Sequence, residues 1–118
     1  MTTKGIEIVV VKRPWGNFRQ FTRNVPSTVK ILTVKAGEEL SLQNHKKRSE
    51  FWHVVHGDGI IQVGKRKKNV GEGNEFYIPE GEMHRLIAGS SGIIVLEIAM
   101  GEFDENDIIR YEDKYGRV

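Results

Sequence analysis

The sequence has no cysteine among its 118 residues. A disulfide framework, a thiol nucleophile and a cysteine-bound zinc are therefore excluded, and any metal must be held by histidine, carboxylate or amide ligands. A dominant charge of one sign is missing too, because 18 Lys and Arg stand against 16 Asp and Glu. The resulting net charge of +2 is too small to indicate nucleic acid or a membrane surface as the main partner.

Long hydrophobic runs are also missing. The N-terminal apolar run, residues 8–11, is too short for the apolar core of a signal peptide. No other stretch approaches the ~18 apolar residues that a membrane-spanning helix needs. We therefore expect a soluble, cytoplasmic protein. At roughly 100–200 residues per domain, residues 1–118 should form a single domain.

Residues that favour β-strands are abundant. Val, Ile and Thr together supply 29 residues, whereas Ala and Leu supply eight. Short apolar runs alternate with glycine-rich or charged breaks, a pattern that predicts an all-β sandwich or small barrel. The expected strands are residues 6–11, 29–34, 51–55, 60–63, 75–78 and 93–99. Only residues 104–110 have the composition of a helical turn.

The densest run of charge is Lys65-Arg66-Lys67-Lys68. It lies between an expected strand and the Gly71-Glu72-Gly73 turn, so we expect a solvated hairpin loop that also discourages edge-to-edge pairing of sheets. Contact with a phosphate or a nucleic acid is the alternative interpretation.

Two glycine-framed segments combine histidine, glutamate and proline at regular spacing. Their members are Gly37, Gln43, His45, Glu50 and Gly57 in the first segment, and Gly73, Pro79, Gly81 and His84 in the second. This spacing resembles the two motifs of the cupin superfamily, which implies a double-stranded β-helix, that is, a small jelly-roll barrel. The resemblance also implies a metal site with Gln43, His45, Glu50 and His84 as ligands, Gln43 standing where the superfamily has its leading histidine.

Elementary geometry agrees with such a site. Gln43 and His45 are two residues apart, so on a strand both side chains point to one face, which a barrel closes into an interior. The nitrogen and oxygen ligands suit Zn²⁺, with Fe, Mn, Co or Ni as alternatives. By alternation from Glu50, His56 faces the same side and His53 the opposite side, and we assign neither as a ligand.

Longer segments are similar to the type II mannose-6-phosphate isomerase domain. They are Arg13-Pro14-Trp15-Gly16, residues 40–45, residues 48–52, residues 77–79 with His84-Arg85, and the tail 107–117. In that family the domain is often the C-terminal part of a bifunctional chain that also carries mannose-1-phosphate guanylyltransferase, which is missing from this sequence. The resemblance therefore implies a metal-dependent isomerase that interconverts mannose 6-phosphate and fructose 6-phosphate through an enediol. A small sugar phosphate and a second copy of the chain, in a homodimer, are the expected partners.

This reaction needs a group that moves a proton and a cation that binds phosphate. Glu97, in the middle of an apolar strand, is the candidate catalytic carboxyl, with Glu82 as a second possibility. Arg110 and Arg117 are the candidates for the phosphate, because a guanidinium binds oxyanions bidentately and keeps its charge. We expect the tail after Gly101, which carries both arginines, to fold across the open end of the barrel.

Two other functions are compatible with the same motifs. A non-catalytic sugar-binding cupin module would keep the barrel without turnover. A cupin dioxygenase would need a redox metal and no phosphate clamp. The arginine-rich tail favours the isomerase over the dioxygenase.

Overall fold

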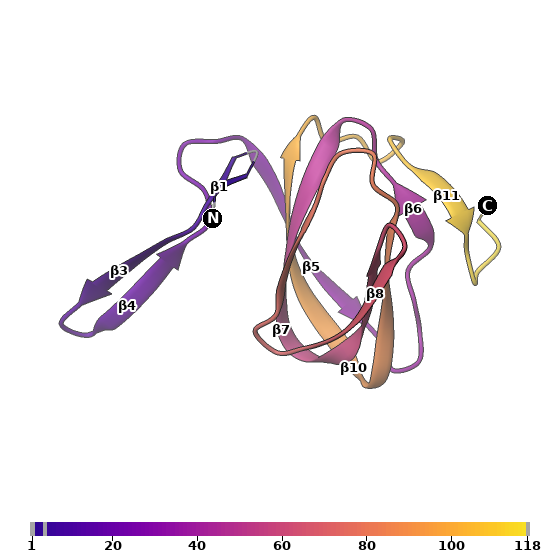
Figure 1. Ribbon diagram of the computed structural model, residues 1–118, viewed down its shortest axis with the longest axis horizontal. Helices are drawn as coiled ribbons and strands as arrows, with labels where there is room; N and C mark the ends of the chain where they lie inside the picture. Colours follow the sequence, from indigo (N-terminus) through magenta and orange to yellow (C-terminus); the bar gives the residue numbers. More distant parts are fainter. Residues whose placement is uncertain (1, 4, 118) are drawn as a thin grey trace.

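The computed structural model describes residues 2–3, by their backbone alone, and residues 5–117, and all regular structure in them is β (Figure 1). The strands are β1 (Thr2–Thr3), β2 (Ile6–Glu7), β3 (Val9–Arg13), β4 (Gly16–Gln20), β5 (Ser27–Val34), β6 (Leu42–Asn44), β7 (Arg48–Val63), β8 (Arg66–Gly71), β9 (Glu75–Ile78), β10 (His84–Gly101) and β11 (Ile109–Glu112). Within these residues there is no helix of the length and apolarity that a membrane span needs.

Two long strands, β7 and β10, form the centre of the fold. They pair antiparallel twice, residues 59–63 with residues 84–88, and residues 48–57 with residues 93–101. The first pairing continues into β8 on one side and into β6 and β11 on the other. The second continues into β5 and β9. Because both strands bend between the two pairings, they contribute to two layers that face each other (Figure 1), which confirms the predicted all-β jelly-roll architecture.

Glycine makes the bend possible. Gly57 and Gly92 lie where β7 and β10 pass from one layer to the other, and both have positive φ, 87° and 73°. A Cβ on Gly57 would collide with the carbonyl oxygen of Gly92. Only glycine therefore permits this close approach of the two backbones.

The main core lies between the layers, and a smaller one lies outside. Alternation along β7 sends Trp52 and Val54 inward, where they pack among Ile61, Leu86, Val95 and their neighbours. Phe51 points the other way and is fully buried under the N-terminal segment, in a cluster with Ile6, Ile98 and Met100. The N-terminal segment therefore covers part of the outer face of one layer.

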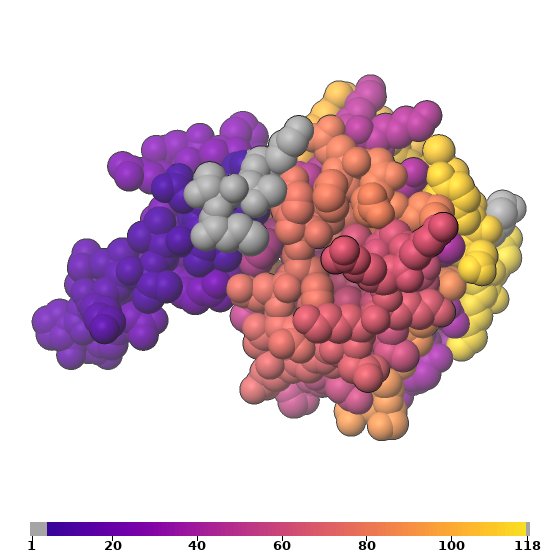
Figure 2. Space-filling model, viewed as in Figure 1, coloured from indigo at the N-terminus to yellow at the C-terminus, as the bar shows by residue number. Residues whose placement is uncertain are grey.

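A hairpin formed by β3 and β4 projects from the barrel (Figures 1 and 2). Trp15 at its turn is 72% exposed. Near the base of the hairpin, Arg19 makes an ion pair with Glu75 of β9, with Nη2 2.9 Å from Oε1, and so ties the hairpin to the barrel.

Two local predictions were wrong. Residues 104–110 form no helical turn; Asp107 N–H donates to the carbonyl of Asp104, and the chain then enters strand β11. The charged run is not a loop, because the turn ends at Lys65 and Arg66 begins β8. The tail was expected to fold across the open end of the barrel, and in the structure its strand β11 pairs with β6.

Candidate metal centre

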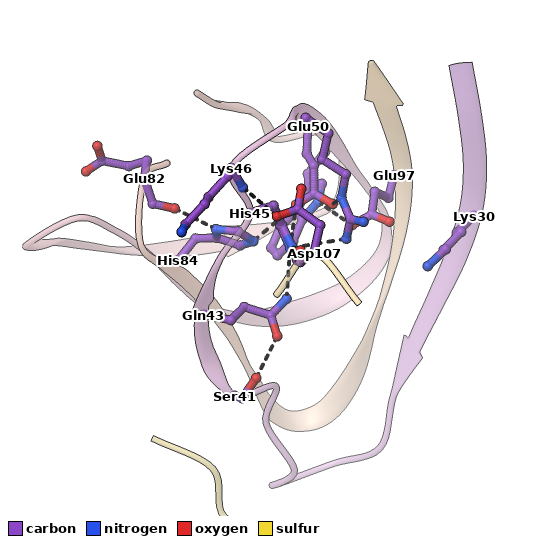
Figure 3. A network of polar contacts seen from close by, with 12 residues as sticks. Lys30, Ser41, Gln43, His45, Lys46, Glu50, Glu82, His84, Glu97 and Asp107 are labelled. Atoms are coloured by element: carbon purple, nitrogen blue, oxygen red, sulfur yellow. Dashed lines mark hydrogen bonds and ion pairs between the residues drawn. The ribbon is translucent and has the colours of Figure 1, made fainter. Parts of the chain in front are cut away.

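Three of the predicted ligands come together inside the barrel. His45, Glu50 and His84 are all buried, and their ligand atoms lie within 4.8 Å of one another (Figure 3). They come from three places in the chain: His45 follows β6, Glu50 lies near the start of β7, and His84 begins β10. This cluster could hold one metal ion.

Backbone carbonyls fix the orientation of both imidazole rings. His45 Nδ1 lies 2.7 Å from the carbonyl oxygen of Asp107, and His84 Nδ1 lies 2.9 Å from that of Glu82. A carbonyl oxygen only accepts, so each Nδ1 must carry the proton. Each Nε2 then carries a lone pair directed at the cluster, free in His84 and accepting from Arg48 in His45, which is the tautomer that a metal-binding histidine needs.

The buried atoms of the cluster fit a cation. Both carboxylate oxygens of Glu50 and Nε2 of His84 are buried and make no hydrogen bond of normal geometry with any described residue. His84 Nε2 and Glu50 Oε1 are 3.1 Å apart, so one ion could bridge them. Leaving such atoms without a hydrogen bond in a barrel interior is costly, and a divalent ion would give all three a partner. Two imidazoles and a carboxylate match the ligands of Zn²⁺ and of other first-row metals.

Gln43, the fourth predicted ligand, lies against the same cluster. Its Nε2 is 3.4 Å from His45 Nε2, and its Oε1 accepts a hydrogen bond of 2.6 Å from Ser41 Oγ. A hydroxyl accepts as well as donates, so the amide can turn over, donate to Ser41 and present its oxygen to the cluster. Gln43 therefore has the position of a ligand and a neighbour that tolerates the ligand orientation.

Arg48 belongs to the site, although the sequence pattern had assigned it no role. Its Nη2 donates to His45 Nε2 at 3.2 Å, and its Nε lies 3.4 Å from Glu50 Oε2. Phe103 lies against the guanidinium, 4.3 Å from Cζ to the ring centroid. The sequence spacing could have placed Arg48 in the site, because Arg48 is two residues from Glu50 and so lies on the same face of the strand.

Glu97, the predicted catalytic carboxyl, is next to Glu50. It is 5% exposed, and Trp52 Nε1 donates to its Oε1 at 3.1 Å. Burial, the negative charge of Glu50 and contact with that carboxylate raise the pKa of Glu97 to about 8. Burial alone would raise the pKa of Glu50 as well, but the close approach of His84 and Glu97 lowers it to about 2. One carboxyl of the pair is thus ionised and the other protonated near neutral pH, an arrangement typical of acid–base sites.

Burial also lowers the pKa of His45, more than its bond to Asp107 raises it. A neutral imidazole is the form that binds a metal.

The two predicted arginines lie in different surroundings. Arg110 pairs with Gln43 across β11 and β6, and Gln43 pairs with His84 across β6 and β10, so all three side chains share one face of the sheet. The Nε of Arg110 is buried and makes no hydrogen bond with a described residue. Arg117 instead makes hydrogen bonds of 2.7 and 3.0 Å to the carboxylate of Asp113. The structure therefore brings Arg110, and not Arg117, beside the ligands.

The remaining two histidines are outside the site. His53 faces away from Glu50, as predicted, and its Nδ1 lies 2.8 Å from Glu75 Oε2. His56 is 72% exposed beside Glu72, although alternation placed it on the side of Glu50. A register shift between Ile94 and Val95 interrupts the alternation along the β7–β10 ladder.

A two-layered antiparallel barrel that holds two histidines and a glutamate between its layers defines a cupin. Within that class, the chain belongs to the family described as mannose-6-phosphate isomerase C-terminal, whose sequence model matches residues 5–113. It is 39% identical over 110 residues to mannose-1-phosphate guanylyltransferase ManC of Salmonella typhimurium, covering 92% of this chain and 23% of the relative. It is 38% identical over 109 residues to the alginate biosynthesis protein AlgA of Pseudomonas aeruginosa, covering 91% and 23%. The chain thus spans 23% of the length of these curated relatives.

Solved structures share the fold. Oxalate decarboxylase from Bacillus subtilis superimposes with a TM-score of 0.67 at 24% identity, covering 72% of this chain and 24% of that chain. The capsular polysaccharide assembling protein CapF from Staphylococcus aureus superimposes with a TM-score of 0.67 at 20% identity, covering 91% and 33%. At these identities the likeness concerns the fold alone.

Proposed function

We propose that this chain is a metal-dependent aldose–ketose isomerase that interconverts mannose 6-phosphate and fructose 6-phosphate through an enediol. The observation that carries the proposal is the buried cluster of His45, Glu50 and His84 with the protonated carboxyl of Glu97 beside it, in a barrel of this family. The isomerisation needs an electrophile at the C1 and C2 oxygens and a group that moves a proton between these carbons. Both requirements are met in one place.

His45, Glu50 and His84 would hold the metal, and the amide oxygen of Gln43 would be the fourth ligand. We propose Zn²⁺, because the ligands fit it and the reaction needs no change of metal oxidation state. When bound, such an ion supplies Lewis acidity that polarises the substrate oxygens.

Glu97 is the proposed proton-transfer group. In the metal-free chain, burial and the charge of Glu50 raise its pKa to about 8, and a carboxyl with a pKa near neutral pH can both accept and return a proton. Trp52 holds one of its oxygens, so the carboxyl keeps a fixed direction next to Glu50.

Arg110 is the group proposed to stabilise the enediolate. It lies one strand from Gln43, so its guanidinium can reach an oxygen held at the metal end of the substrate. Arg117 remains a phosphate candidate that must exchange its bond to Asp113 for one to the substrate.

The segment between β10 and β11 shields one end of the site. The ring of Phe103 is contacted by Lys30 of β5 and by Arg48 of β7, at 4.4 and 4.3 Å from the ring centroid. Asp107 then meets His45 (Figure 3). This crossing limits the access of water to the cluster, which protects an enediolate from side reactions.

A second copy of the chain is the other proposed partner. A two-stranded hairpin is marginal on its own, yet β3 and β4 expose Val10 and Trp15. The outer face of β5 exposes Val29 and Ile31. Light scattering should give twice the chain mass of 13.5 kDa, and a monomer at micromolar concentration would contradict the homodimer.

The function is tested by metal analysis of the purified chain followed by a coupled assay on mannose 6-phosphate, with and without chelator. We expect one divalent metal per chain, turnover that chelator abolishes, and recovery on adding Zn²⁺. His84→Ala should lose both metal and turnover, whereas His53→Ala, an outward-facing histidine, should keep both. Metal-bound protein without turnover would instead favour a sugar-binding module.

A further inference from the structure

A cavity of the molecule lies between β8 and β9, and none of the predicted metal ligands is among its lining residues. No backbone hydrogen-bond ladder joins β8 to β9 among the described residues, and a cavity of about 680 Å³ lies along these two strands. Ile61, Val63 and Phe76 form apolar walls, and Arg66 and Lys68 of β8 also line it. The exposed residues of β8, in crimson, lie on the front surface of the barrel in Figure 2, so the β8 wall of the cavity borders solvent.

The strand register connects this cavity to the metal cluster. His84 of β10 pairs with Val63 of β7, and Val63 pairs with Arg66 of β8, so the three side chains share one face of the sheet. Arg66 is two strand spacings from His84, about 10 Å. Lys68 lies opposite Ile61 on the same face. Lys67 points to the other face and does not line the cavity.

The cations of this cavity are not neutralised. Lys65, Arg66 and Lys68 line it, and none of them makes an ion pair with a described residue. Of the two lining carboxylates, Glu75 is already bound by Arg19 and His53, which leaves Glu82. An excess of unpaired cations over apolar walls is a site for an anion, because a partly desolvated wall strengthens the attraction.

Phe103 and Asp107 pack against Arg48 and His45, so the segment before β11 covers that part of the cluster. A substrate that reaches the metal ligands must then extend toward the open cavity. An open-chain hexose phosphate carries its phosphate at the far end of a six-carbon chain from C1, a length comparable with two strand spacings.

We propose that Arg66 and Lys68 bind the phosphate of the substrate, with the sugar chain lying along Val63 toward His84. This inference rests on the proposed isomerase function and assigns the substrate's second anchor. It also gives the charged run of residues 65–68 a role that follows from its alternation: the inward members bind the anion and the outward Lys67 faces solvent.

The test compares Arg66→Ala and Lys68→Ala with the matched control Lys67→Ala, all at exposed positions of one strand. A charged hydrogen bond to phosphate contributes enough that each inward variant should raise KM for mannose 6-phosphate and the inhibition constant of inorganic phosphate roughly 10- to 150-fold. Turnover at saturation should stay within about threefold, because neither side chain meets the reacting carbons. Lys67→Ala should match the parent.

Binding of inorganic phosphate to the metal-loaded chain, measured by calorimetry, separates this inference from the proposed function. If the parent binds phosphate and both inward variants lose that binding, the anion site stands even if mannose 6-phosphate is not turned over. If Arg66→Ala and Lys68→Ala bind phosphate as Lys67→Ala does, the inference is overturned even if the parent is an active isomerase. Loss of phosphate inhibition in Arg110→Ala or Arg117→Ala, with Arg66→Ala and Lys68→Ala inhibited as the parent is, would likewise overturn it.

Discussion

Replacing Glu97 by glutamine should stabilise the metal-free protein at alkaline pH. Glu97→Gln keeps the size of the side chain and an oxygen for Trp52 Nε1, but it cannot ionise. In the parent, burial and the neighbouring charge of Glu50 raise the pKa of Glu97 from 4.5 to about 8. The folded state therefore holds a proton that the unfolded chain has already released.

The sign of the effect follows from that difference. A raised pKa contributes stability that is fully present below the ordinary pKa and is lost as the pH rises through the folded value. A tenfold change in proton affinity corresponds to about 1.4 kcal/mol, so the free energy of unfolding of the parent should fall by on the order of 3 to 4 kcal/mol between pH 5 and pH 8. The free energy of unfolding of Glu97→Gln should not show this loss between pH 5 and pH 8.

Urea unfolding of both proteins after removal of metal by chelator, at pH 5 and at pH 8, measures the difference. We expect the variant to be more stable than the parent by on the order of 4 kcal/mol at pH 8 and by about 1 kcal/mol at pH 5. The comparison at pH 5 is the internal control, because Glu97 is then protonated in the folded parent. Equal stabilities at pH 8 would refute the reasoning, since they would mean that the carboxyl ionises in the folded state without cost.

Five further substitutions test the site. His45→Ala or His84→Ala should strip the bound metal and leave the barrel folded, because the surrounding core is apolar; full metal stoichiometry by elemental analysis in either variant would show that the ligands are wrongly assigned. Gln43→His should keep the metal, since it restores the general cupin pattern, and should lower turnover in the coupled assay; unchanged turnover would remove any role of the amide. Arg110→Ala should lower turnover with little change in KM, whereas Arg117→Ala should act on KM if it meets phosphate; parental kinetics in both would remove the tail from the reaction.

The cluster of His45, Glu50 and His84 and the layered β-fold could be predicted from the sequence, the cluster from the resemblance of two short motifs and the fold from the alternation of apolar runs and breaks. Gln43, His45 and Glu50 are close in sequence, and strand geometry alone places the first two on one face. The abundance of β-branched residues in the apolar runs predicted that these runs form strands.

Strand β8 was missed for a physical reason. Arg66 and Lys68 point inward but face an open cavity rather than the core, so they are as polar as the outward Lys67. The segment therefore lacks the alternation of apolar and polar residues that marks a half-buried strand. Burial of a strand face, not strand geometry, is what sequence patterns report.

The position of Arg48 and the exposure of His56 needed the three-dimensional structure for other reasons. Arg48 is bound by Phe103 and Asp104 from a distant part of the chain, which local spacing does not contain. His56 depends on a single register shift in the β7–β10 ladder, and one extra residue reverses the face of every side chain beyond it.

The tie between His45 and the carbonyl of Asp107 spans 62 positions of the chain, and it sets the order of events during folding. A site assembled from β6, β7, β10 and the segment before β11 exists only after these long loops have closed, and such topologies fold in milliseconds to seconds. Metal cannot nucleate this process, because no local segment presents the complete set of ligands. Added zinc should therefore leave the refolding rate almost unchanged and slow unfolding instead, because the ion binds and stabilises a barrel that has already formed.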